Sequence, residues 1–423
     1  RSIVAVNAEA FSECPKLVVL DLSACTLLRH IGHGAFRSCA ALERFVAPPC
    51  VETLGSRVLA GCPKLAAVDL SWCRALTSVG EFTLCNCASL ETVAFPPKLG
   101  TLSEGVLSGC RKLVSVDLSA CRVLRNLGER AFSNCAALTT VAFPPCLDTL
   151  SHRVLSECPA LVDVDLSAYR MLRHVGHGVL RKCTQLEIVV FPPKVDTLNH
   201  YVLSECPKLT VVDLRACRSL RVIGNHAFSH CDALATVLFP PGLEVLGNLV
   251  LSECPKLAAI DLRECRALRT MGQGALSNCA ELHTVAFPPC IAVLQGRVLA
   301  GCPKLAAVDL HGRSQLRTIG DRALSNCASL ETVLFPPHLE ALGSHVLSDC
   351  PNLATVDLRC CPELRSIGPE VLSRCRQLST VSFPPSLEAL HQNVLSDCPH
   401  LAAVDLSGCV ALRTIGGRAF SNC

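Results

Sequence analysis

The sequence has few aromatic residues and little excess charge. Phe, Tyr and Trp make up 4% of the 423 residues, and the formal net charge is +3. A nucleic-acid-binding protein usually has a strongly basic surface, so this near balance argues against a nucleic-acid partner. Although half of the residues are hydrophobic, no run reaches the ~18 uncharged apolar residues that a membrane helix needs. We therefore expect no membrane insertion within this segment.

Motifs of catalysis and cofactor binding are also missing. There is no phosphate-binding loop, no nucleophile motif and no carboxylate pair in a shaped environment, so we expect neither enzymatic activity nor a cofactor. The 30 cysteines include no Cys-x-x-Cys pair, and Cys85 with Cys87 or Cys360 with Cys361 lacks the spacing of zinc ligands. A metal site is therefore not expected. The fourteen histidines show no shared repeat position, which favours exposed surface residues.

The chain is built from a repeat of 48 residues. Asp-Leu recurs at this interval from Asp21 to Asp405, and each repeat has two similar halves, such as residues 113–137 and 138–160. A fixed period without insertions is typical of a solenoid, in which each coil packs only on its neighbours. We expect a single solenoid of about 17 coils over residues 1–423. Neither end has the polar cap of a solenoid, so we expect a fragment of a longer protein.

Each coil is predicted to contain one short strand and one outer turn. In residues 113–137, Leu113, Val116 and Leu118 alternate with polar residues, as in a strand with one buried face. Strands of successive coils would form a parallel sheet with about 4.8 Å between them. Pro-Pro ends the strand in the 23-residue coils, because proline has no N–H to donate. Ala-Phe-Ser-Asn-Cys and Val-Leu-Ser-Glu-Cys are predicted to form short helical turns on the opposite face.

Most of the cysteines follow the repeat. Eighteen occupy one position in successive coils, and we interpret them as a buried column of small apolar side chains with weak S–H donors. Their Cβ atoms would point the same way at about 4.8 Å, which is too far apart for disulfides. Seven more follow the strand in the 25-residue coils. Pairing of loop cysteines, as between Cys25 and Cys50, stays open.

Charges of opposite sign alternate at another repeat position. Arg29, Glu52, Arg125 and Asp148 belong to this series. The alternation predicts a ladder of surface ion pairs, each contributing roughly 0.2–1 kcal/mol and serving mainly to fix the register of the coils.

The exposed face of the strands supplies the candidate binding residues. Each Asp of Asp-Leu shares this face with the residue two positions later, which is serine in the first four repeats and basic in most later ones. The candidates on this predicted concave face are Asp21, Asp69, Asp117, Asp165, Ser71, Ser119, Ser167, Asp213, Arg215, Asp261, Arg263, Asp357 and Arg359. Two interpretations stay open: a solvated face without function, or an acidic N-terminal surface that orients a basic partner.

The pattern Leu-x-x-Val-x-Phe-Pro-Pro-x-Leu-x-x-Leu-x-x-x-Val-Leu-Ser-x-Cys resembles the BspA-type leucine-rich repeat, also called the TpLRR class. The resemblance covers essentially the whole chain, while the 25-residue halves are similar to cysteine-containing leucine-rich repeats. It implies an α/β solenoid, a right-handed coil with a parallel sheet on the concave face and short helical turns on the convex face. Similar proteins are surface adhesins and antigens of bacteria and parasitic protists. The resemblance thus implies a non-enzymatic protein-binding or adhesion module, at the cell surface or secreted.

An intracellular leucine-rich repeat scaffold in a reducing compartment is the alternative. The many cysteines without disulfide spacing and the lack of any Asn-x-Ser/Thr site among twelve asparagines favour it. Both alternatives predict a protein ligand, and they differ in the compartment.

Overall fold

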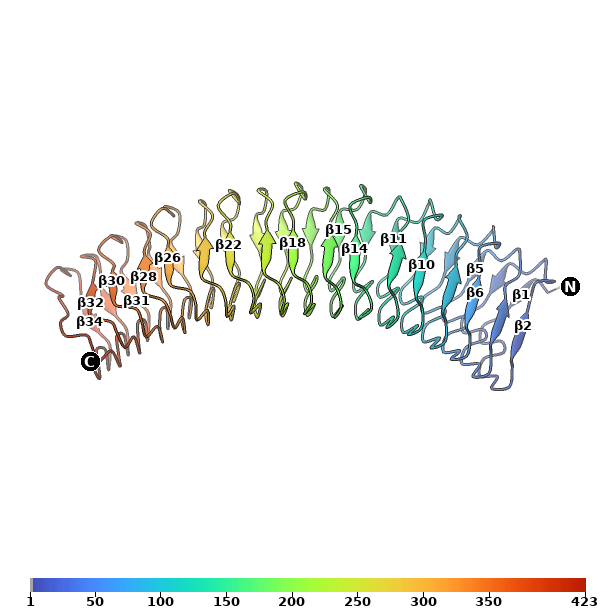
Figure 1. Ribbon diagram of the computed structural model, residues 1–423, viewed down its shortest axis with the longest axis horizontal. Coiled ribbons are helices and arrows are strands. Elements are labelled where there is room, and N and C mark those ends of the chain that lie inside the picture. The colour runs from blue at the N-terminus through green and yellow to red at the C-terminus, as the bar shows by residue number, and fades with distance from the viewer. Residues whose placement is uncertain (1–2) are drawn as a thin grey trace. The chain divides into compact units, whose positions relative to one another are not determined.

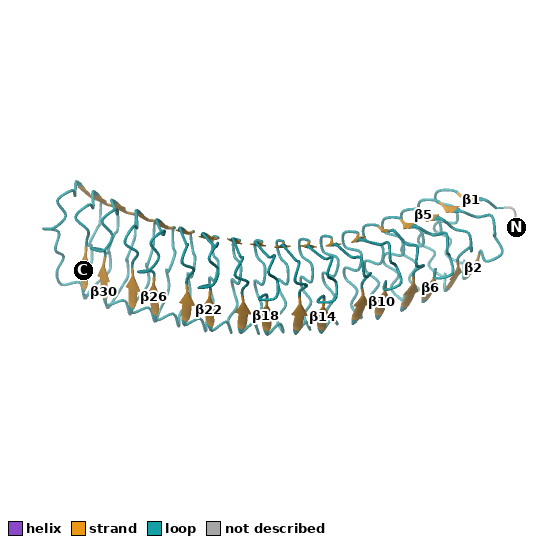
Figure 2. Cartoon of the chain, turned by 90° about the horizontal axis from the view of Figure 1, so that it is seen from above, coloured by secondary structure: helices purple, strands orange, loops and turns teal. Residues whose placement is uncertain are grey.

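The computed structural model describes residues 3–423 (Figure 1). Contacts within the chain divide it into an N-terminal unit, residues 1–206, and a C-terminal unit, residues 207–423. Each unit is a stack of coils with two ladders of short parallel strands, and within each unit the two ladders follow opposite edges of the coils (Figure 2). The predicted parallel sheet is confirmed. That one solenoid spans the whole chain stays a prediction.

The first ladder consists of the three-residue strands in which Asp-Leu occurs. In the N-terminal unit they are β2 (Val19–Asp21), β4 (Arg44–Val46), β6 (Ala67–Asp69), β8 (Thr92–Ala94), β10 (Ser115–Asp117), β12 (Thr140–Ala142), β14 (Asp163–Asp165) and β16 (Ile188–Val190). In the C-terminal unit they are β18 (Val211–Asp213), β20 (Thr236–Leu238), β22 (Ala259–Asp261), β24 (Thr284–Ala286), β26 (Ala307–Asp309), β28 (Thr332–Leu334), β30 (Thr355–Asp357) and β32 (Thr380–Ser382).

The second ladder consists of two-residue strands, and the sequence pattern did not predict it. In the N-terminal unit these are β1 (Ala5–Val6), β3 (His30–Ile31), β5 (Thr53–Leu54), β7 (Ser78–Val79), β9 (Thr101–Leu102), β11 (Asn126–Leu127), β13 (Thr149–Leu150), β15 (His174–Val175) and β17 (Thr197–Leu198). In the C-terminal unit they are β19 (Val222–Ile223), β21 (Val245–Leu246), β23 (Thr270–Met271), β25 (Val293–Leu294), β27 (Thr318–Ile319), β29 (Ala341–Leu342), β31 (Ser366–Ile367), β33 (Ala389–Leu390) and β34 (Thr414–Ile415).

The two ladders differ in continuity within the C-terminal unit. The second ladder is unbroken from β19 to β34, with both residues of each strand in register. The first ladder is divided into two-stranded blocks, because β22, β26 and β30 pair only with the strand that follows. The second ladder is therefore the continuous hydrogen-bonded seam of this unit.

The predicted helical turns are wrong: residues 3–423 contain no helix. In the corresponding segments alternate residues have positive φ, as in Leu249, Leu251 and Glu253 at 56°, 58° and 57°. The amide of Leu249 donates to a carbonyl of the next coil at 2.7 Å, whereas that of Leu251 donates to the preceding coil at 3.1 Å. An α-helix would need these amides to bond four residues back in their own segment. Neighbouring coils supply the acceptors instead, and so short a segment cannot form a stable helix alone.

The interior is filled by the predicted apolar columns. Leu118, Phe143, Leu166 and Phe191 are all buried. The repeat cysteines from Cys39 to Cys398 are buried too, and most donate S–H to a carbonyl of the preceding coil, which confirms the predicted column. No helix in the described part of the chain is long and apolar enough to span a membrane.

Candidate binding surface

Each Asp of Asp-Leu caps the turn at the end of its strand. The Oδ1 atom accepts the backbone N–H of the residue two positions later, at 2.8 to 3.0 Å in all nine copies. This is an Asx turn, which the carboxylate forms whether the later residue is Ser, Arg or His. The aspartates therefore have a structural role in addition to any role in binding, and sequence reasoning missed it.

In the N-terminal unit the aspartates are exposed and have serine partners. Asp69, Asp117 and Asp165 project from β6, β10 and β14, and small apolar residues of β8 and β12 lie between them. Neighbouring carboxylates are thus two coils, or about 10 Å, apart. Hydrogen bonds from the side chain and backbone of Ser119 lower the pKa of Asp117, and Ser167 does the same for Asp165. Both carboxylates are therefore ionised at neutral pH.

In the C-terminal unit three of the aspartates are held by arginine. Arg215 donates from Nε to Oδ1 of Asp213 at 3.0 Å and from Nη2 to Oδ2 at 2.7 Å. The same two-bond contact joins Arg263 to Asp261 and Arg359 to Asp357. The structure therefore places all candidate residues on the exposed side of the first ladder, which we call the strand face. Its assignment to a concave side stays a prediction.

The predicted ladder of surface ion pairs is present in part. Arg29, Arg221, Arg317 and Arg365 each contact the Glu of the following coil. Asp196 instead contacts His174, the residue next to Arg173, at 3.1 Å. Asp148 likewise lies 2.5 Å from the side-chain amide group of Asn126 rather than close to Arg125. The side chains are exposed, so each pair contributes little stability.

Three histidines do share a repeat position, contrary to the sequence interpretation. His152, His177 and His200 stack on successive coils with ring centroids 4.4 and 4.7 Å apart. Nδ1 of His152 accepts the backbone N–H of His177 at 2.9 Å, and Nδ1 of His177 accepts that of His200 at 3.2 Å. Their spacing of 25 and then 23 residues equals the spacing of the column cysteines and could have revealed them.

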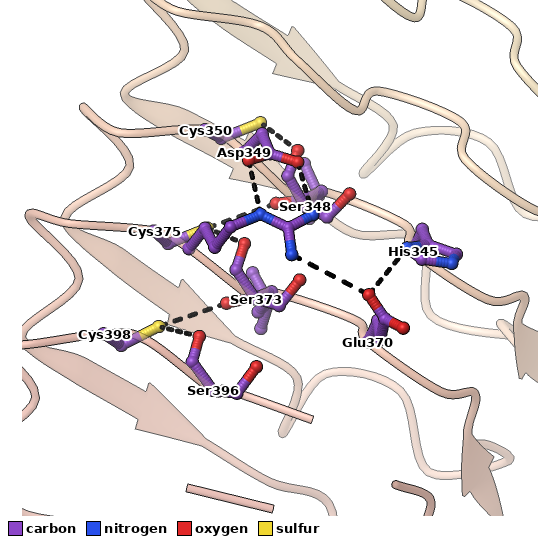
Figure 3. Close-up of polar contacts among 12 residues, drawn as sticks. His345, Ser348, Asp349, Cys350, Glu370, Ser373, Cys375, Ser396 and Cys398 are labelled. Carbon is purple, nitrogen blue, oxygen red and sulfur yellow. Dashed lines mark hydrogen bonds and ion pairs between the residues drawn. The ribbon is translucent and has the colours of Figure 1, made fainter. Parts of the chain in front are cut away.

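A second group that the sequence did not indicate lies on the outer segments, where His345, Asp349 and Glu370 (Figure 3) gather around the side chain of Arg374. Its guanidinium donates to both carboxylate oxygens of Asp349, at 2.6 and 2.7 Å, and lies 3.8 Å from Glu370, which also contacts His345 at 3.2 Å. The Oγ of Ser373 is buried, and none of the described residues accepts its hydrogen bond. It therefore lacks the adjacent base that a nucleophilic serine needs.

Metal-binding groups do not gather elsewhere in the described structure. Among residues 3–423, no three His, Cys, Asp or Glu side chains converge on a point where an ion could sit. The thiols are free, and that of the loop residue Cys146 donates to the carbonyls of Arg122 and Leu124 at 3.0 and 3.1 Å.

Comparison with known proteins supports the architecture. The model of the BspA-type leucine-rich repeat region matches residues 4–122, 117–217, 211–315 and 309–423. A leucine-rich repeat protein from Bacteroides ovatus is similar in structure, with a TM-score of 0.63, 21% identity, and 88% of this chain and 80% of that chain covered. A leucine-rich cell surface protein from Faecalibacterium prausnitzii has a TM-score of 0.42 and 15% identity, with 90% and 83% covered. A leucine-rich repeat protein from T. pallidum has a TM-score of 0.32 and 24% identity, with 44% and 72% covered. No curated protein matched the sequence significantly.

Proposed function

Because the chain belongs to the BspA-type leucine-rich repeat family, we propose that it is a non-enzymatic protein-binding module that contacts a basic partner through the strand face of the N-terminal unit. Leucine-rich repeat proteins generally bind protein partners. A stack of coils presents a long row of side chains at fixed spacing, which suits an extended protein surface.

The state of the carboxylates carries this proposal. Asp117 and Asp165 accept hydrogen bonds only from the serine of their own turn, and no basic side chain within residues 3–423 forms an ion pair with either carboxylate. The corresponding oxygens of Asp213, Asp261 and Asp357 are occupied by arginine. A row of ionised, unneutralised carboxylates attracts a basic partner and fixes its register.

Two triple variants test the proposal with equal changes in net charge. Asn keeps the Oδ1 acceptor, so Asp69→Asn, Asp117→Asn and Asp165→Asn together should preserve the turns. Binding of a fluorescent Lys-Ser repeat peptide of about 15 residues, measured by anisotropy, should weaken at least fivefold at about 50 mM salt and less at about 200 mM. The equivalent change in the C-terminal unit, D213N/D261N/D357N, should leave the affinity within about twofold. Equal weakening by both variants would reduce the effect to overall charge and refute the proposal.

We further propose that the protein acts at the cell surface or is secreted, as the resemblance to BspA-type adhesins implies. The thirty free thiols favour the second candidate, an intracellular scaffold. Thiol titration of the protein isolated from its source, denatured without reductant, separates the two. Near-complete reactivity would support the reducing compartment, and a large unreactive fraction would support the oxidising one.

A further inference from the structure

A row of basic side chains follows the loops after the first ladder in the N-terminal unit. We call it the basic loop edge, and it consists of Arg74, Lys98, Arg122, Arg125, Arg170, Arg173 and Lys194. All seven are exposed, and none has an ion-pair partner or a side-chain hydrogen bond within residues 3–423. Two carboxylates lie along this row, Asp196 in the loop of Lys194 and Asp148 in the intervening loop without a basic residue, and they contact His174 and Asn126 instead. The edge therefore retains a net positive charge.

The repeat places these residues on one continuous surface. In the C-terminal unit the equivalent positions, among them Pro362, Arg365 and Ser386, line a single shallow hollow. Arg122 and Arg125 lie 240 residues, or five repeats, before Pro362 and Arg365. Cys146 occupies the loop position that Lys98 and Lys194 occupy in other coils. Its thiol lies 3.0 Å from the carbonyl of Arg122, so the lysine position is adjacent to the arginine position.

The coil itself does not require unpaired basic residues at these positions. In the C-terminal unit Arg221, Arg317 and Arg365 each lie 3.3 Å from a glutamate of the next coil. Arg266, the equivalent of Arg170, lies 3.6 Å from Glu264. These loops therefore fold both with an arginine that a glutamate neutralises and with an arginine that has no such partner.

Exposed apolar side chains accompany the basic ones. Trp72, Val123 and Met171 are 37%, 57% and 47% exposed, and each lies within two residues of a basic residue of the edge. Val123 and Met171 correspond to Ser219 and Ala267 in the C-terminal unit, so the loop itself does not require an apolar side chain at this position. Surfaces that combine arginine with exposed apolar and aromatic residues are typical of protein interfaces.

We propose that the basic loop edge of the N-terminal unit binds an extended acidic protein segment that also carries apolar side chains, at a surface separate from the strand face. Arg122 and Arg170 are two coils, or about 10 Å, apart. An extended chain in the polyproline II conformation repeats every three residues, or about 9.3 Å. A segment with a carboxylate at every third residue and apolar residues between therefore matches the row. The apolar contacts favour a protein segment over a sulfated polysaccharide or a nucleic acid.

A fluorescent peptide of about five Glu-Leu-Ser repeats tests this proposal by anisotropy. The variant Lys98→Gln, Arg122→Gln and Arg170→Gln should weaken peptide binding at least fivefold, and the effect should shrink as salt rises. The control R221Q/R317Q/R365Q removes the same charge from paired positions and should change the affinity less than about twofold. Circular dichroism confirms that both variants are folded. Equal weakening by the two variants would overturn the proposal, and D69N/D117N/D165N should leave this binding unweakened because the strand face is separate.

A separate experiment tests the contribution of the exposed apolar side chains to peptide binding. The double change V123S/M171S should weaken binding of the Glu-Leu-Ser peptide and leave a Glu-Ser-Ser peptide unaffected. If both peptides and heparin bind equally tightly, the edge selects charge alone and the assignment to a protein segment is wrong. Light scattering at rising protein concentration is the last check, because self-association that the lysine and arginine variant abolishes would make a second copy the occupant and contradict the proposal.

Discussion

Replacement of Gly128 by alanine should unstack the N-terminal unit locally. A Cβ at this position would lie 2.2 Å from the carbonyl carbon of Ser103, 2.3 Å from its oxygen and 2.6 Å from the amide nitrogen of Glu104. All three are backbone atoms, so only separation of the two coils can relieve the clash. Overpacking of this kind costs about 1–3 kcal/mol. Loss of the 2.8 Å hydrogen bond from Gly128 to Leu102 adds about 0.5–1.5 kcal/mol.

We therefore expect Gly128→Ala to lower the free energy of unfolding by about 2–4 kcal/mol. Gly100→Ala is the matched control in the same unit, because its Cβ would meet no atom closer than 3.7 Å. Urea unfolding followed by circular dichroism measures both, and the midpoint should fall for the first variant only. Equal midpoints would show that the coils have room for a side chain here, and the argument from close backbone approach would be wrong.

Two further predictions concern the core and the histidine stack. Leu118→Asp buries a charge without a partner and should destabilise the protein by more than ~3 kcal/mol, whereas Ser119→Asp, on the exposed face, should change the urea midpoint little. Burial, and then the neighbouring imidazoles, lower the pKa of His177, so the native state binds a proton less readily than the unfolded state. Stability should therefore fall as the pH drops below about 6.5. His177→Asn keeps a hydrogen-bond acceptor for the next coil, as Asn248 does. This variant should flatten the pH dependence of the thermal midpoint. An unchanged pH dependence would exclude the histidine stack as the cause of that dependence.

The sequence predicts the first ladder well because its strands alternate in polarity. Leu118 and Phe143 are buried where that alternation puts them, and the partner strands are parallel and in register. The second ladder has only two residues per strand, as in Thr149 and Leu150, which is too short for an alternation to be visible. Helical turns were expected because the residues of these outer segments are compatible with a helical conformation. Hydrogen bonds between neighbouring coils determine the conformation instead, and these bonds cannot be inferred from the residues of one segment alone.

For the candidate site, the sequence predicts on which face the residues lie better than it predicts which residues contact each other. Asp213 and Arg215 share a face, as period-two geometry requires, and the structure adds the two-bond clamp between them. The turn-capping role of the aspartates was also accessible, since Asp followed two residues later by Ser is a pattern of Asx turns. Prediction of the histidine stack would have required an alignment of the 23- and 25-residue coils through the turn.

The comparison of the two units separates what the fold requires from what a partner could use. Asp117 and Asp213 make the same bond through Oδ1, so the turn is satisfied in both units. They differ at Oδ2, which arginine occupies in the C-terminal unit alone. Some loop arginines differ in the same way, because Arg317 has a glutamate partner and Arg125 has none within residues 3–423, although Arg29 of the N-terminal unit is paired with Glu52. Exposed ion pairs contribute little to stability, so these differences have small effects on folding and large effects on the surface potential. Both proposed binding surfaces therefore lie in the N-terminal unit, and they differ in the sign of their charge.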